Sequence, residues 1–474
     1  MHKKEIRRSL DCRADSAAVP QGMRADEISL VKLLCVLYDK GWNHICQQEA
    51  SGMNLTPIPT PAQSAFQDWE FGVFFHFGIR TFYEGHQDWD GLPMPPEAFD
   101  PKELDCRQWL SAAREAGARY AILVCKHHDG FANWPTKYSD YSVAGTPWKD
   151  GKGDVVREFT DACRELGLKV GLYYSPAQAG FRDWSAQEYD GYFVNQITEL
   201  LSNYGRIDYL WFDGCGSGDH RYDAARIVSV IRALQPDILL FNMWDPDTRW
   251  SGNESGLTGL DNRSFVRMVD VAVDVSNPEI IEGGCYLPVE CNCCMRGHTW
   301  FYSGRNEHTL KTPEELFALY CASVGNNGNF LLNIGPDRRG LLPEADVSRL
   351  LALGELVRRR LVDAVIPCRF AAEGNVYTAR FARSEAEEQL VSGVILEEDL
   401  AAGEKIDAFH VELMPSSYGA RMIPVHIGQA VGHKRICLFP PIRTGTVRVV
   451  VDGAAPGARL KNIAVLRADS RCIP

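Results

Sequence analysis

The chain has 474 residues, which is long enough for one large domain and a smaller one. Of these residues 45% are hydrophobic and 24% are charged, a composition typical of folded globular proteins. Its formal net charge of −12 argues against the basic surface that nucleic acids and anionic membranes require. We therefore expect no nucleic-acid partner and no membrane partner, and a neutral substrate such as a sugar fits this charge better.

The cysteines indicate a reducing compartment. Fifteen of them are spread along the chain, an odd number, which is typical of free thiols rather than of a disulfide framework. The charged residues 1–8 are not followed by a continuous apolar segment, and the apolar patch 30–38 is short and contains Lys32. We therefore expect a cytoplasmic protein without a signal peptide or a membrane span.

Residues 1–60 have a mixed pattern, and we expect an N-terminal extension whose role the sequence does not indicate. From there to residue 360, apolar runs typical of buried strands alternate with amphipathic helices. The predicted strands are 72–77, 120–126, 169–174, 209–212, 238–243 and 330–334, with a weaker candidate near Ile280. The predicted helices are 104–116, 154–166, 186–201, 222–234 and 313–324.

Repeated strand and helix units over 61–360 predict an α/β fold, a (β/α)8 TIM-like barrel, for which roughly 250 residues are typical. A doubly wound open sheet is the alternative. The barrel is favoured because it gathers the carboxyl ends of all strands around one mouth, and polar residues stand at or just after several of these ends. They are His76, His127, His128, Tyr174, Asp213 and Asn333.

The pattern changes after Arg360. Short runs of alternating apolar and polar residues, such as 376–381 and 446–451, are separated by turns. This pattern predicts a smaller C-terminal β-sandwich domain over 361–474.

Two carboxylates are the candidate catalytic residues. Asp213 follows the predicted strand 209–212, which would place it at the barrel mouth, although an aspartate after a strand is also a common helix N-cap. Glu254 follows Trp250 in a polar loop with two glycines. It is either a general acid beside an aromatic surface or a solvated loop residue. Two acids facing one pocket are the minimum for glycoside hydrolysis.

His127, His128 and Asp129 follow the strand 120–126. They could hold a metal ion, but neighbouring residues on a strand point to opposite faces and seldom bind one ion. We therefore favour neutral imidazoles that hydrogen-bond substrate hydroxyls, with His76 converging from the first strand. Buried histidines that contact only protein are the alternative.

Cysteines at 285, 291, 293 and 294 form the densest group of thiols. Their spacing matches no common zinc motif, and the adjacent pair is too close for a relaxed tetrahedral site. Glu290, within this group, and Trp300, after it, are instead interpreted as pocket lining. Tryptophans are frequent in the segments at the barrel mouth, where sugar rings would stack on them. They are Trp89, Trp134, Trp211, Trp250 and Trp300.

Five segments between residues 69 and 360 resemble, in the same order, the α-L-fucosidases of glycoside hydrolase family 29. They are 72–78 (GVFFHFG), 126–131 (KHHDGF), 171–175 (GLYYS), 211–214 (WFDG) and 329–336 (NFLLNIGP). In that family the aspartate of the WFDG segment is the nucleophile, which corresponds to Asp213. The segment 249–254 (RWSGNE) resembles the subfamily that prefers α-1,3 and α-1,4 branched fucosides, in which the glutamate, here Glu254, is the acid/base.

The resemblance implies a retaining exo-α-L-fucosidase that needs no metal or organic cofactor and acts on a fucosylated small molecule or oligosaccharide. We expect sugar-binding roles for His76, Trp89, His127, His128, Tyr174, Trp211, Arg249, Trp250, Glu290 and Trp300. Two other classes stay open, a catalytically inactive carbohydrate-binding barrel and a metal-dependent hydrolase that uses the His-His-Asp segment. No feature indicates an oligomeric state.

Overall fold

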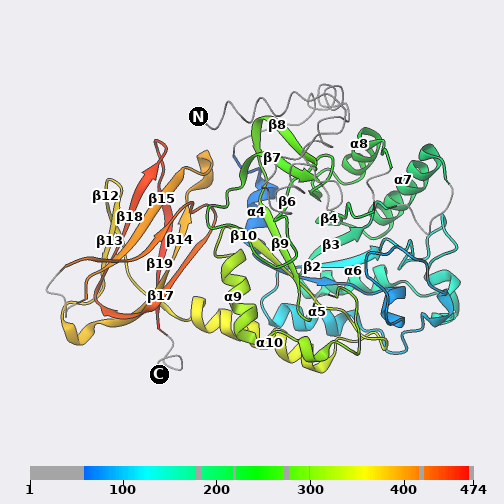
Figure 1. The fold of residues 1–474 in the computed structure, drawn as a ribbon, viewed down its shortest axis with the longest axis horizontal. Coiled ribbons are helices and arrows are strands. Elements are labelled where there is room, and N and C mark those ends of the chain that lie inside the picture. The colour runs from blue at the N-terminus through cyan, green and yellow to red at the C-terminus, as the bar shows by residue number, and fades with distance from the viewer. Residues whose placement is uncertain are drawn as a thin grey trace, which may run out of the picture. The chain divides into compact units, whose positions relative to one another are not determined.

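The computed structural model describes residues 58–177, 184–216, 220–271, 277–297, 299–415 and 421–468. The predicted N-terminal extension 1–60 lies outside these ranges, apart from 58–60. Along the described chain a barrel is followed by an antiparallel β domain, as predicted (Figure 1). None of the helices in these ranges is both long enough and apolar enough to cross a lipid bilayer.

Eight parallel strands form the barrel in chain order. They are β1 (Phe71–Phe75), β2 (Tyr120–Lys126), β3 (Lys169–Tyr174), β4 (Tyr209–Phe212), β5 (Leu239–Phe241), β6 (Arg249–Trp250), β9 (Val289–Cys294) and β10 (Gly328–Asn333). Each strand except β5 pairs with the next in this series, and β10 pairs with β1. Between β5 and β6 the circle is completed by a single parallel bridge from Phe241 to Thr248.

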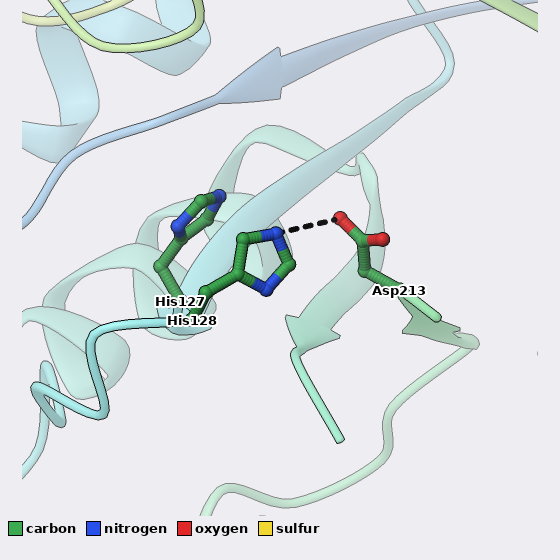
Figure 2. A group of neighbouring side chains, drawn as sticks. All are labelled: His127, His128 and Asp213. Carbon is green, nitrogen blue, oxygen red and sulfur yellow. Dashed lines mark ion pairs between the residues drawn. The ribbon is translucent and has the colours of Figure 1, made fainter. Parts of the chain in front are cut away.

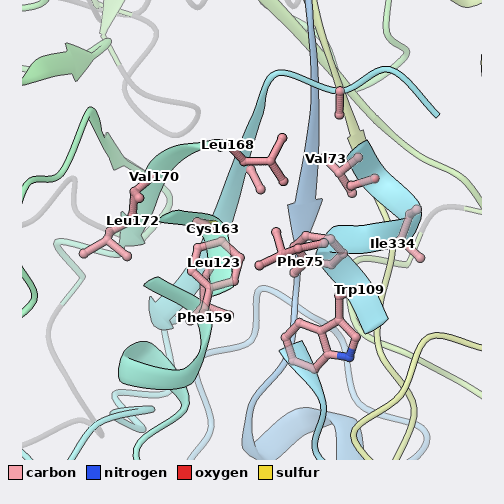
Figure 3. Packing of buried hydrophobic residues seen from close by; sticks show 14 of the residues in the cluster. Val73, Phe75, Trp109, Leu123, Phe159, Cys163, Leu168, Val170, Leu172 and Ile334 are labelled. Atoms are coloured by element: carbon pink, nitrogen blue, oxygen red, sulfur yellow. The ribbon is translucent and has the colours of Figure 1, made fainter. Parts of the chain in front are cut away.

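Helices cover the outside of the barrel. They are α5 (Cys106–Glu115), α6 (Val155–Leu166), α7 (Ala186–Asn203), α8 (Ala224–Leu234), α9 (Pro313–Ser323) and α10 (Glu344–Val357). Trp109 of α5 and Phe159 of α6 pack with the strand residues Val73 and Phe75 in one fully buried core (Figure 3). Replacing one such ring by alanine costs about 3–5 kcal/mol of stability. This core fixes the strands whose ends carry the site.

A short helix, α4 (Pro61–Trp69), closes the amino-terminal end of the barrel. In its first turn Thr60 and Gln63 form a capping box, which satisfies N–H groups that a helix otherwise leaves unpaired. The Gln63 side chain also donates to the Tyr286 carbonyl at 2.6 Å, and the Phe66 ring belongs to the core inside the barrel. The amino-terminal end is therefore filled by protein.

The structure differs from the predicted strands between β5 and β10. The segment near Ile280 belongs to β8 (Asn277–Tyr286), which pairs antiparallel with β7 (Phe265–Val271) in a separate two-stranded sheet. The barrel strands of this part are β6 and β9, and neither was predicted. β6 has two residues in a polar segment, and β9 carries Glu290, Asn292 and three cysteines instead of a continuous apolar run.

Two antiparallel sheets form the C-terminal domain. One has the order β11-β19-β14-β17 and the other β12-β13-β18-β15-β16. The strands are β11 (Val365–Ile366), β12 (Ala371–Glu373), β13 (Val376–Arg380), β14 (Gln389–Glu398), β15 (Ile406–Leu413), β16 (Ile423–Gly428), β17 (Arg435–Thr444), β18 (Thr446–Ala454) and β19 (Leu460–Arg467). Buried residues of both sheets, such as Val394 and Val449, share one core, so the predicted sandwich is confirmed.

Candidate active site

A cavity of about 310 Å³ lies at the carboxyl ends of the barrel strands. Its volume is at the low end for small-molecule sites and suits one sugar ring rather than several. Both predicted catalytic acids, Asp213 and Glu254, line it. The other lining residues are Phe74, His76, Asp88, Trp89, His127, His128, Tyr173, Trp211, Phe212, Gly214, Cys215, Phe241, Asn242, Trp250, Asn292 and Trp300.

Asp213 is held just after β4 by neighbours on two sides. The Tyr173 hydroxyl donates to Oδ2 at 2.8 Å, and the Cys215 backbone N–H donates to Oδ1 at 2.9 Å. Nε2 of His128 lies 3.6 Å from Oδ2 (Figure 2). The N-cap of α8 is Asp223, so the alternative interpretation of Asp213 as a cap is wrong. Its carboxylate is oriented by hydrogen bonds and still faces the cavity.

Glu254 reaches the same cavity from the loop after β6. Gly252 and Gly256 on either side have φ of 82° and 73°, a left-handed conformation that glycine adopts without strain. The N–H groups of Ser251 and Gly256 donate to carbonyls of β9 at 3.0 and 2.9 Å. The loop is therefore attached to the barrel at both ends, and it presents Glu254, half-buried, to the cavity.

The three predicted histidines line the cavity together. His76 Nδ1–H donates to the side-chain oxygen of Asn333 at 2.7 Å. The rings of His127 and His128 have centroids 4.1 Å apart, so the expectation that they diverge is wrong. The reason is that β2 ends at Lys126, and strand alternation does not extend beyond it. Burial lowers the pKa of all three imidazoles, that of His76 to about 3, and keeps them neutral at neutral pH.

Asp129 is not the carboxylate of a His-His-Asp group. Its side chain accepts a hydrogen bond from Nε of Arg80 at 2.8 Å, and the two form a buried ion pair. Among the described residues, one group of possible metal ligands comes together, and it contains Asp213 instead of Asp129. One ligand atom each of His127, His128 and Asp213 lies within 4.8 Å of the other two. The alternative of a metal-dependent hydrolase required Asp129 as a metal ligand, and the Asp129 carboxylate is instead paired with Arg80.

Four aromatic rings stand side by side along the cavity wall. Tyr173 stacks on His127 with 5.6 Å between centroids and on Trp211 with 5.4 Å, and Trp211 stacks on Phe241 with 4.0 Å. Tyr173 is paired with Trp211 in the strand register, and Trp211 with Phe241. Adjacent strands therefore hold successive rings at the same height.

Tyr173 faces the cavity, whereas the predicted Tyr174 faces away from it. Successive residues of a strand point to opposite faces, and the Tyr174 hydroxyl donates to Gln196 of α7 at 2.7 Å. The prediction chose the correct strand and the wrong one of two adjacent tyrosines.

These two tyrosines give a matched test. Tyr173→Phe removes a donor to the Asp213 carboxylate, and a hydrogen bond to a charged group is worth about 1.5–3 kcal/mol, so we expect kcat/KM to fall about 10- to 100-fold. Tyr174→Phe removes the same atom one residue later and should affect the melting temperature but not kcat/KM. Equal losses of kcat/KM in both variants would contradict the role of Tyr173.

Glu290 lies inside the barrel and is absent from the cavity wall, which corrects its predicted place. Its carboxylate accepts hydrogen bonds from Trp211 Nε1–H at 2.8 Å and from the Tyr120 hydroxyl at 2.7 Å. Both donors are neutral, and burial raises the pKa of Glu290 to about 7. Glu290 therefore supports the indole ring of the cavity wall from behind.

The buried Glu290 carboxyl should make stability depend on pH. Its pKa is about 7 in the folded state against about 4.5 in a free carboxyl, so its stabilising contribution is complete below about pH 4.5 and is lost as the pH rises through about 7. The loss amounts to at most about 3 kcal/mol. We expect the melting temperature of Glu290→Gln, which stays neutral, to fall less than that of the wild type between about pH 5 and about pH 7.5.

The control for this experiment is Glu314→Gln, at an exposed position in the first turn of α9. It should follow the wild-type pH dependence. If Glu290→Gln loses thermal stability as steeply as the wild type and the control, the buried carboxyl does not titrate in this range.

Trp89 and Trp250 stand at the edge of the cavity. Trp89 is 52% exposed, whereas Trp250 is half-buried and donates through Nε1–H to Asn292 at 2.9 Å. The side-chain oxygen of Asn242 accepts a hydrogen bond from the Trp250 backbone N–H at 3.2 Å. Both asparagines line the cavity, and the sequence did not point to either.

The remaining predicted residues divide between cavity and support. Trp300 lines the cavity, and its backbone N–H donates at 2.5 Å to the carboxylate of Asp88, a buried cavity residue that the prediction missed. Burial raises the pKa of Asp88. Arg249 does not line the cavity, because its guanidinium donates to the Asn262 side chain at 2.6 Å and to the Arg263 carbonyl at 3.0 Å.

The cysteine-rich strand is part of the barrel wall. Cys293 packs in the core between barrel and helices, and Cys294 packs in the core inside the barrel, as alternation along β9 requires. No cysteine belongs to the group of possible metal ligands found among the described residues. The eleven described cysteines are free thiols.

Comparisons with known proteins identify the family of this chain. A sequence profile of α-L-fucosidases matches residues 94–360, more than half of the chain. Alpha-L-fucosidase 1 of Arabidopsis thaliana is 31% identical over 441 residues, which cover 84% of this chain and 85% of that protein. Tissue alpha-L-fucosidase of Mus musculus is 27% identical over 367 residues, with coverage of 66% and 74%. The crystal structure of a glycoside hydrolase 29 family member from an unknown rumen bacterium is 30% identical, with coverage of 88% and 78% and a TM-score of 0.76. The chain therefore belongs to the α-L-fucosidase family of glycoside hydrolases, family 29.

Proposed function

We propose that this family member is a retaining exo-α-L-fucosidase that removes terminal α-L-fucosyl residues, with Asp213 as nucleophile and Glu254 as acid/base. The observation that carries the proposal is that these two acids, from distant parts of the chain, line one cavity the size of a single sugar. A cavity of this volume accommodates the end of a glycan rather than an internal unit, which supports exo action.

In the first step, an oxygen of Asp213 bonds to the anomeric carbon as the glycosidic bond breaks, and protonated Glu254 gives its proton to the departing oxygen. The product is a fucosyl ester of Asp213 and a free alcohol. The Tyr173 hydroxyl and the Cys215 N–H limit rotation of the attacking carboxylate, so that it is oriented before the sugar binds.

In the second step, Glu254 accepts a proton from water as the water oxygen bonds to the anomeric carbon and the ester breaks. Two displacements return fucose with the anomeric configuration of the substrate. This route requires the two carboxyl groups to lie about 5–5.5 Å apart in the complex, whereas a separation of about 6.5 Å or more belongs to inversion.

Sugar recognition is assigned to neutral groups. A neutral imidazole both donates and accepts, which suits hydroxyl groups, and His76, His127 and His128 all reach the cavity in this state. The rings of Trp211 and Trp300 offer apolar surfaces to the C–H faces of the sugar. The free thiols of the described residues support the expected cytoplasmic location.

The preferred linkages are proposed to be α-1,3 and α-1,4. The support is the segment 249–254, which resembles the subfamily with this preference and supplies both the edge residue Trp250 and Glu254. A panel of α-1,2, α-1,3, α-1,4 and α-1,6 fucosylated oligosaccharides tests this preference by the rate of fucose release.

The proposed reaction is tested by hydrolysis of 4-nitrophenyl α-L-fucoside, followed by proton NMR of the first sugar released. Release of α-L-fucose supports the retaining mechanism, and β-L-fucose as first product would overturn it. Binding of L-fucose without turnover would identify an inactive carbohydrate-binding barrel. Turnover that persists after treatment with a chelator supports the proposed absence of a metal requirement.

A further inference from the structure

We propose that His127, His128 and Asp213 form a binding site for a divalent transition-metal ion of the Zn²⁺ class, and that the bound ion excludes the sugar from the cavity. The metal acts as an inhibitor here and has no part in the reaction. Competition with fucose rests on the proposed function, whereas metal binding itself does not.

The spacing of the ligand atoms fits one ion. One nitrogen from each histidine and one oxygen of Asp213 lie within 4.8 Å of one another (Figure 2). Two atoms bound to one zinc ion at tetrahedral angles lie about 3.4 Å apart, because each bond is about 2.0–2.2 Å long. Nε2 of His128 is 3.6 Å from Oδ2 of Asp213, so an ion fits between them with small side-chain movements.

The hydrogen bonds around the site leave lone pairs of the three ligand residues without a hydrogen-bond partner in the described part of the chain. Nδ1 of His128 is bonded to Ser175 Oγ at 2.6 Å, which leaves Nε2 directed at Asp213. A second hydrogen bond of this kind fixes the orientation of metal-binding histidines in many proteins. Buried Nδ1 of His127 has no hydrogen-bond partner among the described residues. Oδ2 of Asp213 accepts a hydrogen bond from the Tyr173 hydroxyl and Oδ1 accepts one from the Cys215 N–H, and each oxygen has a further lone pair.

The chemistry of the three ligands selects the metal. Two imidazoles and one carboxylate suit Zn²⁺, Co²⁺, Ni²⁺ or Cu²⁺, whereas Mg²⁺ and Ca²⁺ require mostly oxygen ligands. The fourth position of a tetrahedral ion would open into the cavity and hold water. Because Asp213 is the proposed nucleophile, an ion bound to it blocks the position of the anomeric carbon.

The first experiment titrates the purified protein with Co²⁺ and follows its visible d–d absorption, with Zn²⁺ added afterwards to displace it. We expect wild type to bind one more Co²⁺ ion per chain than His128→Gln or Asp213→Asn, and L-fucose to release that ion from wild type. Ser175→Ala, which removes the support behind His128 together with an acceptor for the Ala177 N–H, should weaken binding about 10-fold or more.

Two control variants separate this site from other ligands. Cys215→Ser removes the thiol that lines the same cavity, and His220→Gln removes a histidine that pairs with Asp190 at 2.8 Å outside it. Both should bind Co²⁺ like wild type. The proposal is overturned if Cys215→Ser loses the ion, or if His128→Gln and Asp213→Asn retain it in folded protein, as judged by circular dichroism.

The second experiment measures inhibition of 4-nitrophenyl α-L-fucoside hydrolysis by Zn²⁺. A rise in KM without a change in kcat, reversed by a chelator, supports competition, and a fall in kcat alone overturns it. If the variants differ in Co²⁺ binding but wild type does not hydrolyse the fucoside, the metal site stands and the proposed function fails. If hydrolysis is normal and the variants bind Co²⁺ like wild type, the metal site fails and the function stands.

Discussion

Asp213→Ala should lower kcat for 4-nitrophenyl α-L-fucoside by a factor on the order of 10⁴ to 10⁶, the size of loss seen when an enzyme loses its nucleophile. The alanine side chain cannot form the fucosyl ester, although the cavity and its histidines stay in place. Added azide, small enough to enter the space left by the carboxylate, should restore part of the rate and yield β-L-fucosyl azide, which NMR identifies.

The control for this variant is Asp208→Ala. Asp208 lies at the opposite end of the same strand, where its carboxylate accepts the Val170 N–H at 3.0 Å. It should cost some stability and leave kcat close to that of wild type. Wild-type activity in Asp213→Ala, or an azide product of α configuration, would remove Asp213 from the nucleophile role.

Glu254→Ala should discriminate between leaving groups. General acid catalysis typically contributes about 10²- to 10⁴-fold, so kcat/KM should fall by about this factor for a fucosylated oligosaccharide, whose leaving alcohol needs a proton. It should fall much less for 2,4-dinitrophenyl α-L-fucoside, whose leaving group departs as the anion. Azide should accelerate the second step and give α-L-fucosyl azide, the opposite anomer from the Asp213 variant.

Asp261→Ala is the matched control for Glu254→Ala, because it removes an exposed carboxylate from the same connection after β6. It should not change kcat/KM appreciably for either substrate. A uniform loss on both substrates in Glu254→Ala would mean that Glu254 helps to bind the sugar and does not transfer the proton.

The barrel could be predicted where its strands have continuous apolar runs. β2, β3 and β4 have the predicted bounds because every residue of these strands is buried, apart from Lys169 at the start of β3. β9 was missed because its inward positions hold Glu290 and Asn292, which accept hydrogen bonds from the indole N–H groups of Trp211 and Trp250. β6 was missed because it has only two residues and lies in a polar segment. A buried pair of polar residues leaves no periodic pattern in the sequence, because each residue is buried only through its hydrogen bond to a partner far away in the chain.

The candidate site shows the same division. Asp213 and the histidines could be predicted because each follows a recognisable strand end. Tyr173 was missed because choosing between adjacent tyrosines requires the exact phase of strand alternation. Asp88 could not be found, since its place depends on a loop that meets Trp300, more than two hundred residues later.

The row of rings from His127 to Phe241 has a consequence for how this enzyme can change. Three of those rings, Tyr173, Trp211 and Phe241, are held by the pairing of neighbouring strands, so this part of the surface that meets the terminal sugar is as rigid as the sheet itself. Trp89 and Glu254 belong to connecting loops, and loops tolerate insertion and replacement far better than strands do. Substitutions or insertions in those loops can therefore change which glycan is accepted next to fucose, without disturbing the sheet that contacts the sugar.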